Sequence, residues 1–156
     1  MSVLICGSLA FDTITNFHGR FAQQILPEQV HILNVSFLVP TLRREYGGCA
    51  GNIAYNLKLM GDRGYVMATV GHDFAPYAEW MDKHGVPRDY IQAVLSEHTG
   101  QAFIITDADN NQITAFHPGA MAQSHLSPVP LRDDLAIAIV APDGREAMLA
   151  HAAQLH

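Results

Sequence analysis

The densest group of chemically suggestive residues is a glycine-rich stretch, Gly47-Gly48-Cys49-Ala50-Gly51, which directly precedes a segment with helical periodicity. The first N–H groups of a helix have no partner within the helix, and they lie at the positive end of its dipole. Glycines let a ligand touch this backbone, so such a turn suits an anion or closely packed hydroxyl groups. The stretch lacks the G-x-G-x-x-G pattern of dinucleotide-binding proteins and the Gly-Lys-Ser/Thr ending of a P-loop. On these residues alone, a loop that merely joins two elements is an equal alternative.

Other reactive residue types form no recognisable site. The nine histidines are scattered without the spacings of a zinc site, and the two cysteines, Cys6 and Cys49, lack metal-ligand spacing, so we expect no metal site. Cys49 lies inside the glycine-rich stretch, where a small buried thiol is favoured over an oxidation-sensitive one. Phe103 and Phe116 lie in a predicted hairpin. These rings could stack on a flat base, or they could pack the hairpin onto the core, and the sequence favours neither role over the other.

The composition narrows the possible partners. The chain has 156 residues, of which 49% are hydrophobic and 15% are charged, and its formal net charge is −6. We expect it to bind neither nucleic acid nor a membrane surface, because both need an excess of Lys and Arg. The apolar runs are too short for a membrane helix, and Met1-Ser2-Val3 lacks the basic region of a signal peptide. We therefore expect a soluble, cytoplasmic protein of a length that suits one domain.

The order of the predicted elements indicates an α/β protein with a parallel sheet. Apolar runs predict buried strands at residues 3–12, 65–70 and 135–141. Helices are predicted at residues 52–60, from an N-cap at Asp73 to Gly85, and at about 144–155. In the first of these helices, Ile53, Leu57 and Met60 fall on one face. Three strands that alternate with helices are typical of a doubly covered parallel sheet.

Two segments do not fit this alternation. Residues 30–39 are rich in β-branched and aromatic types and are predicted to be extended. Residues 102–106 and 113–116 predict a hairpin around a turn rich in Asp and Asn. We expect the extended arm and the hairpin to pair with each other as a separate small sheet.

The glycine-rich stretch also belongs to a longer pattern. Gly47-Gly48, Ala50, Asn52 and Ala54, followed by Gly61 and Gly71, resemble the first signature of the ribokinase (PfkB-type) carbohydrate and nucleoside kinases. Supporting matches are the first strand ending in Asp12, the turn at 71–73, the hairpin that starts at Thr99, and residues 118–120. The resemblance covers essentially the whole chain, and through residues 31–37, 48–52 and 111–121 it looks most like the bacterial adenosine kinase-like group.

The resemblance implies a ribokinase-like fold, in which a parallel-sheet core with helices on both faces carries a small β lid over the substrate site. Residues 1–12, 47–98 and 118–156 would form the N-terminal part of the α/β core, and residues 13–46 and 99–117 the lid. The family's second signature, Asp-x-x-Gly-Ala-Gly-Asp, does not occur in the 156 residues. We therefore expect the C-terminal half to be absent and no catalytic residue to lie in this chain. The triplet Pro142-Asp143-Gly144 is the nearest match and is expected to lie on the wrong side of a strand to serve.

The resemblance further implies transfer of the γ-phosphoryl group of ATP to the primary hydroxyl of adenosine. Asp12, the backbone of Gly47 and Gly48, and the amide of Asn52 would bind ribose hydroxyls, because a carboxylate accepts two vicinal O–H groups and an amide both donates and accepts. Phe103 and Phe116 are the candidates for contact with the base.

ATP and Mg²⁺ are the implied cofactors, and their main binding residues belong to the absent half. The alternatives are a ribose- or fructose-type sugar kinase and a non-catalytic binding remnant. Because lid strands often pair between subunits in this family, a homodimer through the lid strands is possible, with residues 28–39 as the exposed edge.

Overall fold

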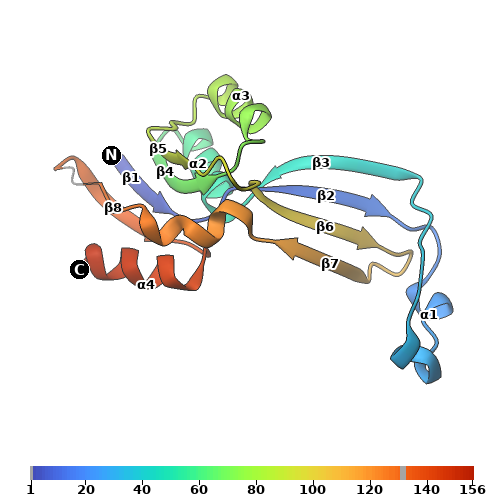
Figure 1. Ribbon diagram of the computed structural model, residues 1–156. Coiled ribbons are helices and arrows are strands. Elements are labelled where there is room, and N and C mark those ends of the chain that lie inside the picture. Colours follow the sequence, from blue (N-terminus) through green and yellow to red (C-terminus); the bar gives the residue numbers. More distant parts are fainter. Residues whose placement is uncertain (1, 131–132) are drawn as a thin grey trace.

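The computed structural model describes residues 2–130 and 133–156 and places the strands in two sheets (Figure 1). The first, the core sheet, is parallel and has the order β5-β4-β1-β8, with β1 (Ser2–Cys6), β4 (Arg63–Val70), β5 (Tyr90–Ala93) and β8 (Leu135–Val140). The second, the lid sheet, has the order β3-β2-β6-β7, with β2 (Ala10–Asn16), β3 (Thr41–Gly47), β6 (Gly100–Thr106) and β7 (Gln112–His117). The α/β class that the sequence predicts is confirmed.

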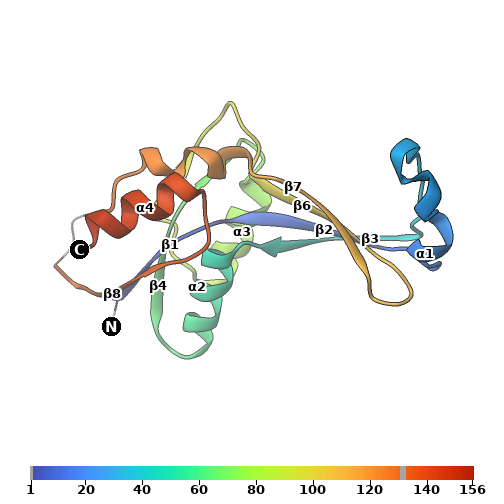
Figure 2. The ribbon, with the colours of Figure 1, turned by 90° about the horizontal axis from the view of Figure 1, so that it is seen from below.

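Helices cover both faces of the core sheet (Figure 2). One face packs on α2 (Cys49–Leu59) and α3 (Ala75–His84), against Val3 and Ile5 of β1. The other face lies under α4 (Arg145–Gln154) and the 3₁₀ helix η2 (Gly119–Leu126). Leu4 and Ile5 are both fully buried, as expected for a strand covered on both faces. The strand predicted at 135–141 forms as β8, but it is the outer strand of the sheet and mostly exposed, so the prediction that it is buried is wrong. Within the described residues, no helix has the length and apolar character needed to cross a membrane.

The first apolar run is two strands, not the single strand predicted at 3–12. After β1 the chain leaves the core sheet at Gly7, and β2 begins the lid sheet at Ala10. The N–H of Gly7 still donates to the carbonyl of Met67 (3.1 Å), whereas the N–H of Ser8 donates to Pro142 in a loop (3.2 Å). The second sheet therefore begins inside the range 1–12 that the sequence division gave to the core. The run stays apolar throughout because Leu9, Ala10 and Phe11 are buried between the two sheets.

The prediction of an extended strand at 30–39 is wrong. Residues Pro27–Ile32 form a 3₁₀ helix (η1) after the short α1 (Phe21–Gln24), and the strand of this arm is β3, at Thr41–Gly47. β3 pairs antiparallel with β2, and β2 pairs in parallel with β6 of the hairpin. The arm and the hairpin thus share one sheet but lie on opposite sides of β2. The β-branched composition of 30–39 misled the prediction because these residues lie mostly exposed at the far end of the lid, where no strand pairs with them.

Helix ends differ from the prediction in two places. α2 begins at Cys49, three residues early, because Gly48 takes a φ of 90° and places Cys49 in the first turn. α3 ends at a left-handed Gly85 as predicted, but Asp73 does not cap it. The carboxylate of Asp73 instead accepts hydrogen bonds from the N–H of Thr99 (2.7 Å) and the side chain of Gln101 (2.9 Å) in the lid.

The buried face of α2 is also narrower than the spacing predicts. Ile53 and Leu57 pack on the core, but Met60, at the C-cap, is 72% exposed. The buried positions are Ala50, Gly51 and Ala54, whose small side chains let the helix approach the sheet closely.

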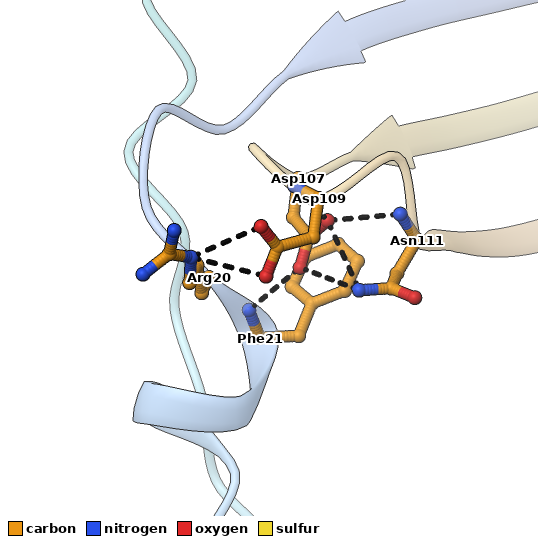
Figure 3. Close-up of polar contacts among 5 residues, drawn as sticks. All are labelled: Arg20, Phe21, Asp107, Asp109 and Asn111. Atoms are coloured by element: carbon orange, nitrogen blue, oxygen red, sulfur yellow. Dashed lines mark hydrogen bonds and ion pairs between the residues drawn. The ribbon is translucent and has the colours of Figure 1, made fainter.

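The tip of the lid is held by one carboxylate, that of Asp107 (Figure 3). Its Oδ2 accepts a hydrogen bond from the N–H of Phe21 (2.9 Å), and its Oδ1 accepts from the N–H groups of Asp109 and Asn111 (both 2.9 Å). The Asn111 side chain donates to the same carboxylate. Asp107 thereby closes the β6–β7 turn and ties it to the start of α1.

We expect Asp107→Ala to free the lid tip, because three N–H groups lose a charged acceptor at once. Amide hydrogen exchange at Phe21, Asp109 and Asn111 should accelerate, while exchange in β1 and β4 stays unchanged. The matched control is Asp109→Ala, which removes an ion pair with Arg20 whose two side chains are 48% and 55% exposed. Such exposed pairs contribute little, so the control should leave the tip protected. Equal protection in both variants would contradict the role of Asp107.

Candidate functional site

A cavity of about 340 Å³ lies where the two sheets meet, at the carboxyl ends of β1 and β8. Ligands of α/β proteins bind at this end of the parallel strands. The lining residues come from the β1–β2 connection, β2, the start of α2, β7, η2 and the β8–α4 connection. They are Ser8, Ala10, Asp12, Gly48, Cys49, Asn52, Phe116, Met121, Pro142 and Asp143.

Ser8 joins three of these segments. Its N–H donates to the carbonyl of Pro142 (3.2 Å), its carbonyl accepts from the N–H of Ala50 (3.0 Å), and its hydroxyl accepts from the N–H of Cys49 (3.1 Å). Two free N–H groups of the first turn of α2 are thus satisfied by one residue. The glycine-rich stretch is therefore the first turn of a helix held on Ser8, and not a flexible loop.

Gly48 allows the start of α2 to lie in direct contact with the backbone of Ser8 and Leu9. A Cβ atom on Gly48 would lie 2.5 Å from the carbonyl oxygen of Ser8 and 2.6 Å from Cα of Leu9, and its φ of 90° is in the region that favours glycine. The N-terminus of α2 can therefore rest directly on the backbone that links the two sheets. This contact brings Asn52, one turn into the helix, to the same cavity as Asp12.

Asp12 lies in a row of residues that crosses the lid sheet on the face toward the cavity. Its register partners are Glu45 on β3 and Ala102 on β6, and Ala102 in turn pairs with Phe116 on β7. Burial, and then the nearby charge of Glu45, raise the pKa of Asp12. The carboxylate lies directly against Gly47, where a Cβ atom would overlap it.

Gly47 is held from behind by α3. The hydroxyl of Tyr77, a fully buried residue of α3, donates to the carbonyl of Gly47 (2.8 Å). Burial, and then the charge of Asp12, raise the pKa of Tyr77, so this hydroxyl keeps its proton and remains a donor. The hydrogen bond from Tyr77 in the core therefore fixes the position of Gly47. Because the Asp12 carboxylate lies against Gly47, the same bond determines the space available to that carboxylate.

The structure brings together four of the six residues proposed from the sequence. Asp12, Gly48, Asn52 and Phe116 line the cavity, and Gly47 lies against Asp12 behind them. Phe103 does not join them, because it pairs with Ala115 and so points to the opposite face of the lid sheet. There it lines a different cavity, of about 660 Å³, with Arg44 and Asp73. A base held beside Asp12 therefore has Phe116 within reach and not Phe103.

Three further lining residues are Cys49, Pro142 and Asp143. Cys49 is partly exposed and lines the cavity, so it is not the buried thiol predicted from its position. Pro142 and Asp143, from the triplet expected to lie on the wrong side of a strand to serve as the missing signature, also line the cavity. Burial raises the pKa of Asp143, against the opposing effects of the Gly144 N–H, the Ser124 hydroxyl and His151. The sequence signal for Asp143 was its position directly after a predicted strand of the parallel sheet, where ligands of such sheets bind.

The chemistry of the lining suits a neutral ligand with several hydrogen-bonding groups. The ten lining residues, all within the described part of the chain, include two carboxylates and no Lys, Arg or His. Such a lining repels a phosphate but accepts hydrogen bonds from hydroxyl and N–H groups. Among the described residues, no group of three or more His, Cys, Asp or Glu side chains is placed to hold a metal ion.

A covered parallel sheet with a β lid that projects from the carboxyl ends of its strands defines a ribokinase-like fold (Figure 1). The chain belongs to the pfkB family of carbohydrate kinases, whose model matches residues 12–155. The family and the fold that the sequence implies are both confirmed.

Several solved and curated relatives are described as nucleoside kinases. The structure of Burkholderia thailandensis nucleoside kinase in complex with inosine matches 98% of this chain with a TM-score of 0.85 and 50% identity. That of Methanocaldococcus jannaschii nucleoside kinase matches 99% with a TM-score of 0.83 and 29% identity. A nucleoside kinase of Methanothermobacter thermautotrophicus is 32% identical over 120 residues, which are 76% of this chain and 36% of that protein. The chain spans about half of the two solved relatives, 48% and 49% of their chains.

We expect Gly48→Ala to destabilise the chain more than Gly61→Ala. Both glycines have a φ close to 90°, which residues other than glycine rarely adopt, so both substitutions carry a backbone cost. A Cβ atom on Gly61 meets nothing within 4 Å, whereas on Gly48 it meets the Ser8–Ala10 backbone. The overlap should add about 1–3 kcal/mol, measured as the difference in the free energy of unfolding by urea. Equal losses would show that α2 does not depend on this close contact.

Proposed function

We propose that this chain is the substrate-binding half of an ATP-dependent kinase that phosphorylates the primary hydroxyl of a nucleoside, with adenosine as the first candidate. The observation that carries the proposal is the single cavity that joins Asp12, Asn52 and Gly48 to the ring of Phe116. ATP, when bound, supplies the phosphoryl group. The residues of this chain bind and orient the acceptor and exclude water from it.

Asp12 and Asn52 divide the recognition of the ribose. The Asp12 carboxylate accepts hydrogen bonds from two vicinal hydroxyls, and the Asn52 amide both donates and accepts. Gly47 and Gly48 carry no side chain, so the sugar ring lies against their backbone. The lid sheet covers the sugar and limits the access of water, which would otherwise accept the phosphoryl group in its place.

Phe116 favours a nucleoside over a free sugar. Its ring is 52% exposed, on the same face of the lid sheet as Asp12, and a flat base is a suitable partner for such a ring. The volume of about 340 Å³ falls within the range of small-molecule sites, about 300–1,000 Å³. The complex of the Burkholderia thailandensis relative with inosine supports the same class of ligand. A ribose- or fructose-type sugar kinase and a non-catalytic binding remnant are the second candidates.

A homodimer through the lid strands and a cytoplasmic location are further parts of the proposal. The lid sheet has β3 and β7 as its outer strands, and Leu42 on β3 and Ile113 on β7 are exposed. Unpaired strand edges with apolar side chains favour association with a second copy.

We expect Asp12→Ala to weaken the binding of adenosine to the chain by about 1.5–3 kcal/mol, the usual contribution of a hydrogen bond to a charged group. Asn52→Ala should cost less, because its hydrogen bonds are neutral. Isothermal titration calorimetry measures both, with Asp89→Ala, an exposed carboxylate outside the cavity, as the control. Unchanged adenosine affinity in Asp12→Ala would contradict the assignment of the ribose site.

The same substitution should leave the free chain at least as stable as the wild type at neutral pH. The pKa of Asp12 is raised in the folded chain, so its ionised form costs stability above that pKa, and the cost disappears as the pH falls through it. Because Asp12 is partly exposed, solvent screening keeps the effect small. Loss of binding without loss of stability, measured by thermal unfolding at pH 7, separates recognition from folding.

We expect the 156-residue chain to bind adenosine without phosphorylating it in the presence of ATP and Mg²⁺. The motif Asp-x-x-Gly-Ala-Gly-Asp, which the family resemblance links to the catalytic base, does not occur in its sequence. A coupled assay of ADP formation, with adenosine present and absent, measures the transfer. Turnover that depends on adenosine would contradict the division between a binding half and a catalytic half.

A further inference from the structure

Tyr77 places a hydroxyl group inside an aromatic cluster of the core, where its side chain is 1% exposed. Its ring contacts four other aromatic rings, with centroids between 5.0 and 5.8 Å apart, which are those of Phe11, Tyr46, Phe74 and Trp80. A phenylalanine would make the same ring contacts, and burying a hydroxyl is costly unless the hydroxyl has a partner. The partner is the carbonyl of Gly47, at 2.8 Å. The hydroxyl therefore serves this contact and not the packing of the core.

The space for this hydroxyl is left by Gly51, a residue of the glycine-rich stretch that does not line the cavity. Gly51 is buried in the first turn of α2, and its φ is not positive, so its backbone does not require glycine. Alanine is favoured over glycine within a helix. A Cβ atom on Gly51, however, would overlap the hydroxyl oxygen of Tyr77 and lie 2.9 Å from a methyl carbon of Leu9. The methyl group ends a flexible side chain and can shift, whereas the hydroxyl is held by its hydrogen bond to Gly47.

Gly47 connects this hydroxyl to the cavity. Its carbonyl accepts the hydrogen bond from Tyr77, and a Cβ atom on Gly47 would overlap the carboxylate of Asp12. Burial raises the pKa of Tyr77 most and the charge of Asp12 raises it further, so the two groups lie close enough to interact. A shift of the Gly47 backbone therefore changes the position that is available to the Asp12 carboxylate.

We propose that the Tyr77 hydroxyl, in the space that Gly51 leaves, is a positioning group for the Asp12 carboxylate and thereby sets the preference of the cavity for a ribose over a deoxyribose. This inference rests on the proposed function, in which Asp12 accepts hydrogen bonds from two vicinal hydroxyls. Two such bonds require one orientation of the carboxylate, because both oxygens must lie within hydrogen-bond distance at once. A single hydroxyl can be met from several orientations. Loss of the Tyr77 hydroxyl should therefore weaken the binding of a ribonucleoside more than that of its 2′-deoxy analogue.

Two variants remove the hydroxyl from its place by different routes. Tyr77→Phe deletes it and keeps the ring contacts, whereas Gly51→Ala displaces it with a Cβ atom from α2. The matched control is Tyr55→Phe, which deletes the hydroxyl of a tyrosine on α2 whose ring packs on Trp80, outside the cavity.

The experiment measures the dissociation constants of adenosine and 2′-deoxyadenosine by isothermal titration calorimetry. The wild-type chain should bind adenosine at least about tenfold more tightly, since a site that pairs with a hydroxyl rejects the analogue that lacks it. In Tyr77→Phe and Gly51→Ala, adenosine should bind about five- to tenfold more weakly and 2′-deoxyadenosine no more than about twofold more weakly. Tyr55→Phe should leave both constants unchanged.

A double-mutant cycle with Asp12→Ala separates positioning from a purely structural role. When Asp12 is already replaced, Tyr77→Phe should change the affinity for adenosine by less than about twofold, because the group that it positions is gone. A structural role would lower the affinity by the same factor in both backgrounds.

The outcomes also separate this inference from the proposed function. The role of Tyr77 is overturned, and the nucleoside site stands, if Tyr77→Phe binds adenosine as the wild-type chain does, weakens both nucleosides equally, or has its full effect in the Asp12→Ala background. A wild-type chain that binds neither nucleoside overturns both proposals. Should Tyr77→Phe fail to fold, as judged by circular dichroism, Gly51→Ala decides by the same criteria. Should neither fold, a wild-type preference for adenosine below about threefold overturns the inference, and one of about tenfold or more supports it.

Discussion

The contact between Ser8 and the first turn of α2 is the interaction on which the rest of the site depends. A single residue accepts two helix N–H groups and donates to the β8–α4 connection, and Gly48 lets the two backbones meet without an intervening side chain. Three segments that are distant in the sequence thus share one hydrogen-bonded frame. Because Ser8 also stands where the chain passes from the core sheet to the lid sheet, the same frame fixes the angle at which the lid leaves the core.

The cavity has a negatively charged lining because the segments that Ser8 connects carry two carboxylates. Asp12 and Asp143 both line the cavity from segments that Ser8 connects, and among the described residues no cationic side chain lines it to balance them. Burial raises the pKa of each carboxyl group, which means that each charge lacks part of its solvation in the free chain. A ligand that donates hydrogen bonds to Asp12 would restore part of the solvation that burial removes from its carboxylate. The cavity is thus arranged for a neutral, donor-rich molecule, and a phosphate would face two like charges.

The sequence predicts the parts of this arrangement that depend on local pattern. The glycine signature placed Gly48 and Asn52 beside Asp12, and apolar runs located β1, β4 and β8, although β8 is mostly exposed and not buried as predicted. The break after Gly7 escaped prediction because Leu9, Ala10 and Phe11 remain buried after the chain changes sheets, so no polar residue marks the change. Asp143 escaped because its place beside Ser8 depends on β8 lying next to β1, and strand order is not a local property.

Phe103 and Phe116 also show that a local sequence pattern does not determine which residues come together in space. The sequence identifies both strands, but the face to which each ring points depends on the register. In the structure Ala102 lies opposite Phe116 and Ala115 lies opposite Phe103, so the two rings point to opposite faces. That register is closed at the turn by Asp107, whose carboxylate binds the N–H groups of Asp109 and Asn111. One acidic residue at the lid tip therefore helps to decide which aromatic ring reaches a cavity at the other end of the same strands.

The lid is also braced at its root. Phe11 and Tyr46 of the lid strands pack against Tyr77 of α3, with ring centroids 5.7 and 5.0 Å apart, and Tyr77 donates to Gly47 beside Asp12. The turn before α3 adds a further link, because the carboxylate of Asp73 accepts hydrogen bonds from Thr99 and Gln101. Bending of the lid would therefore affect mainly the strands beyond Asp12 and Ala102, while the residues near Gly47 stay tied to the core. Under the proposed function, the outer lid would then adapt to the base while the acceptor hydroxyl keeps one position, as transfer to a single hydroxyl requires.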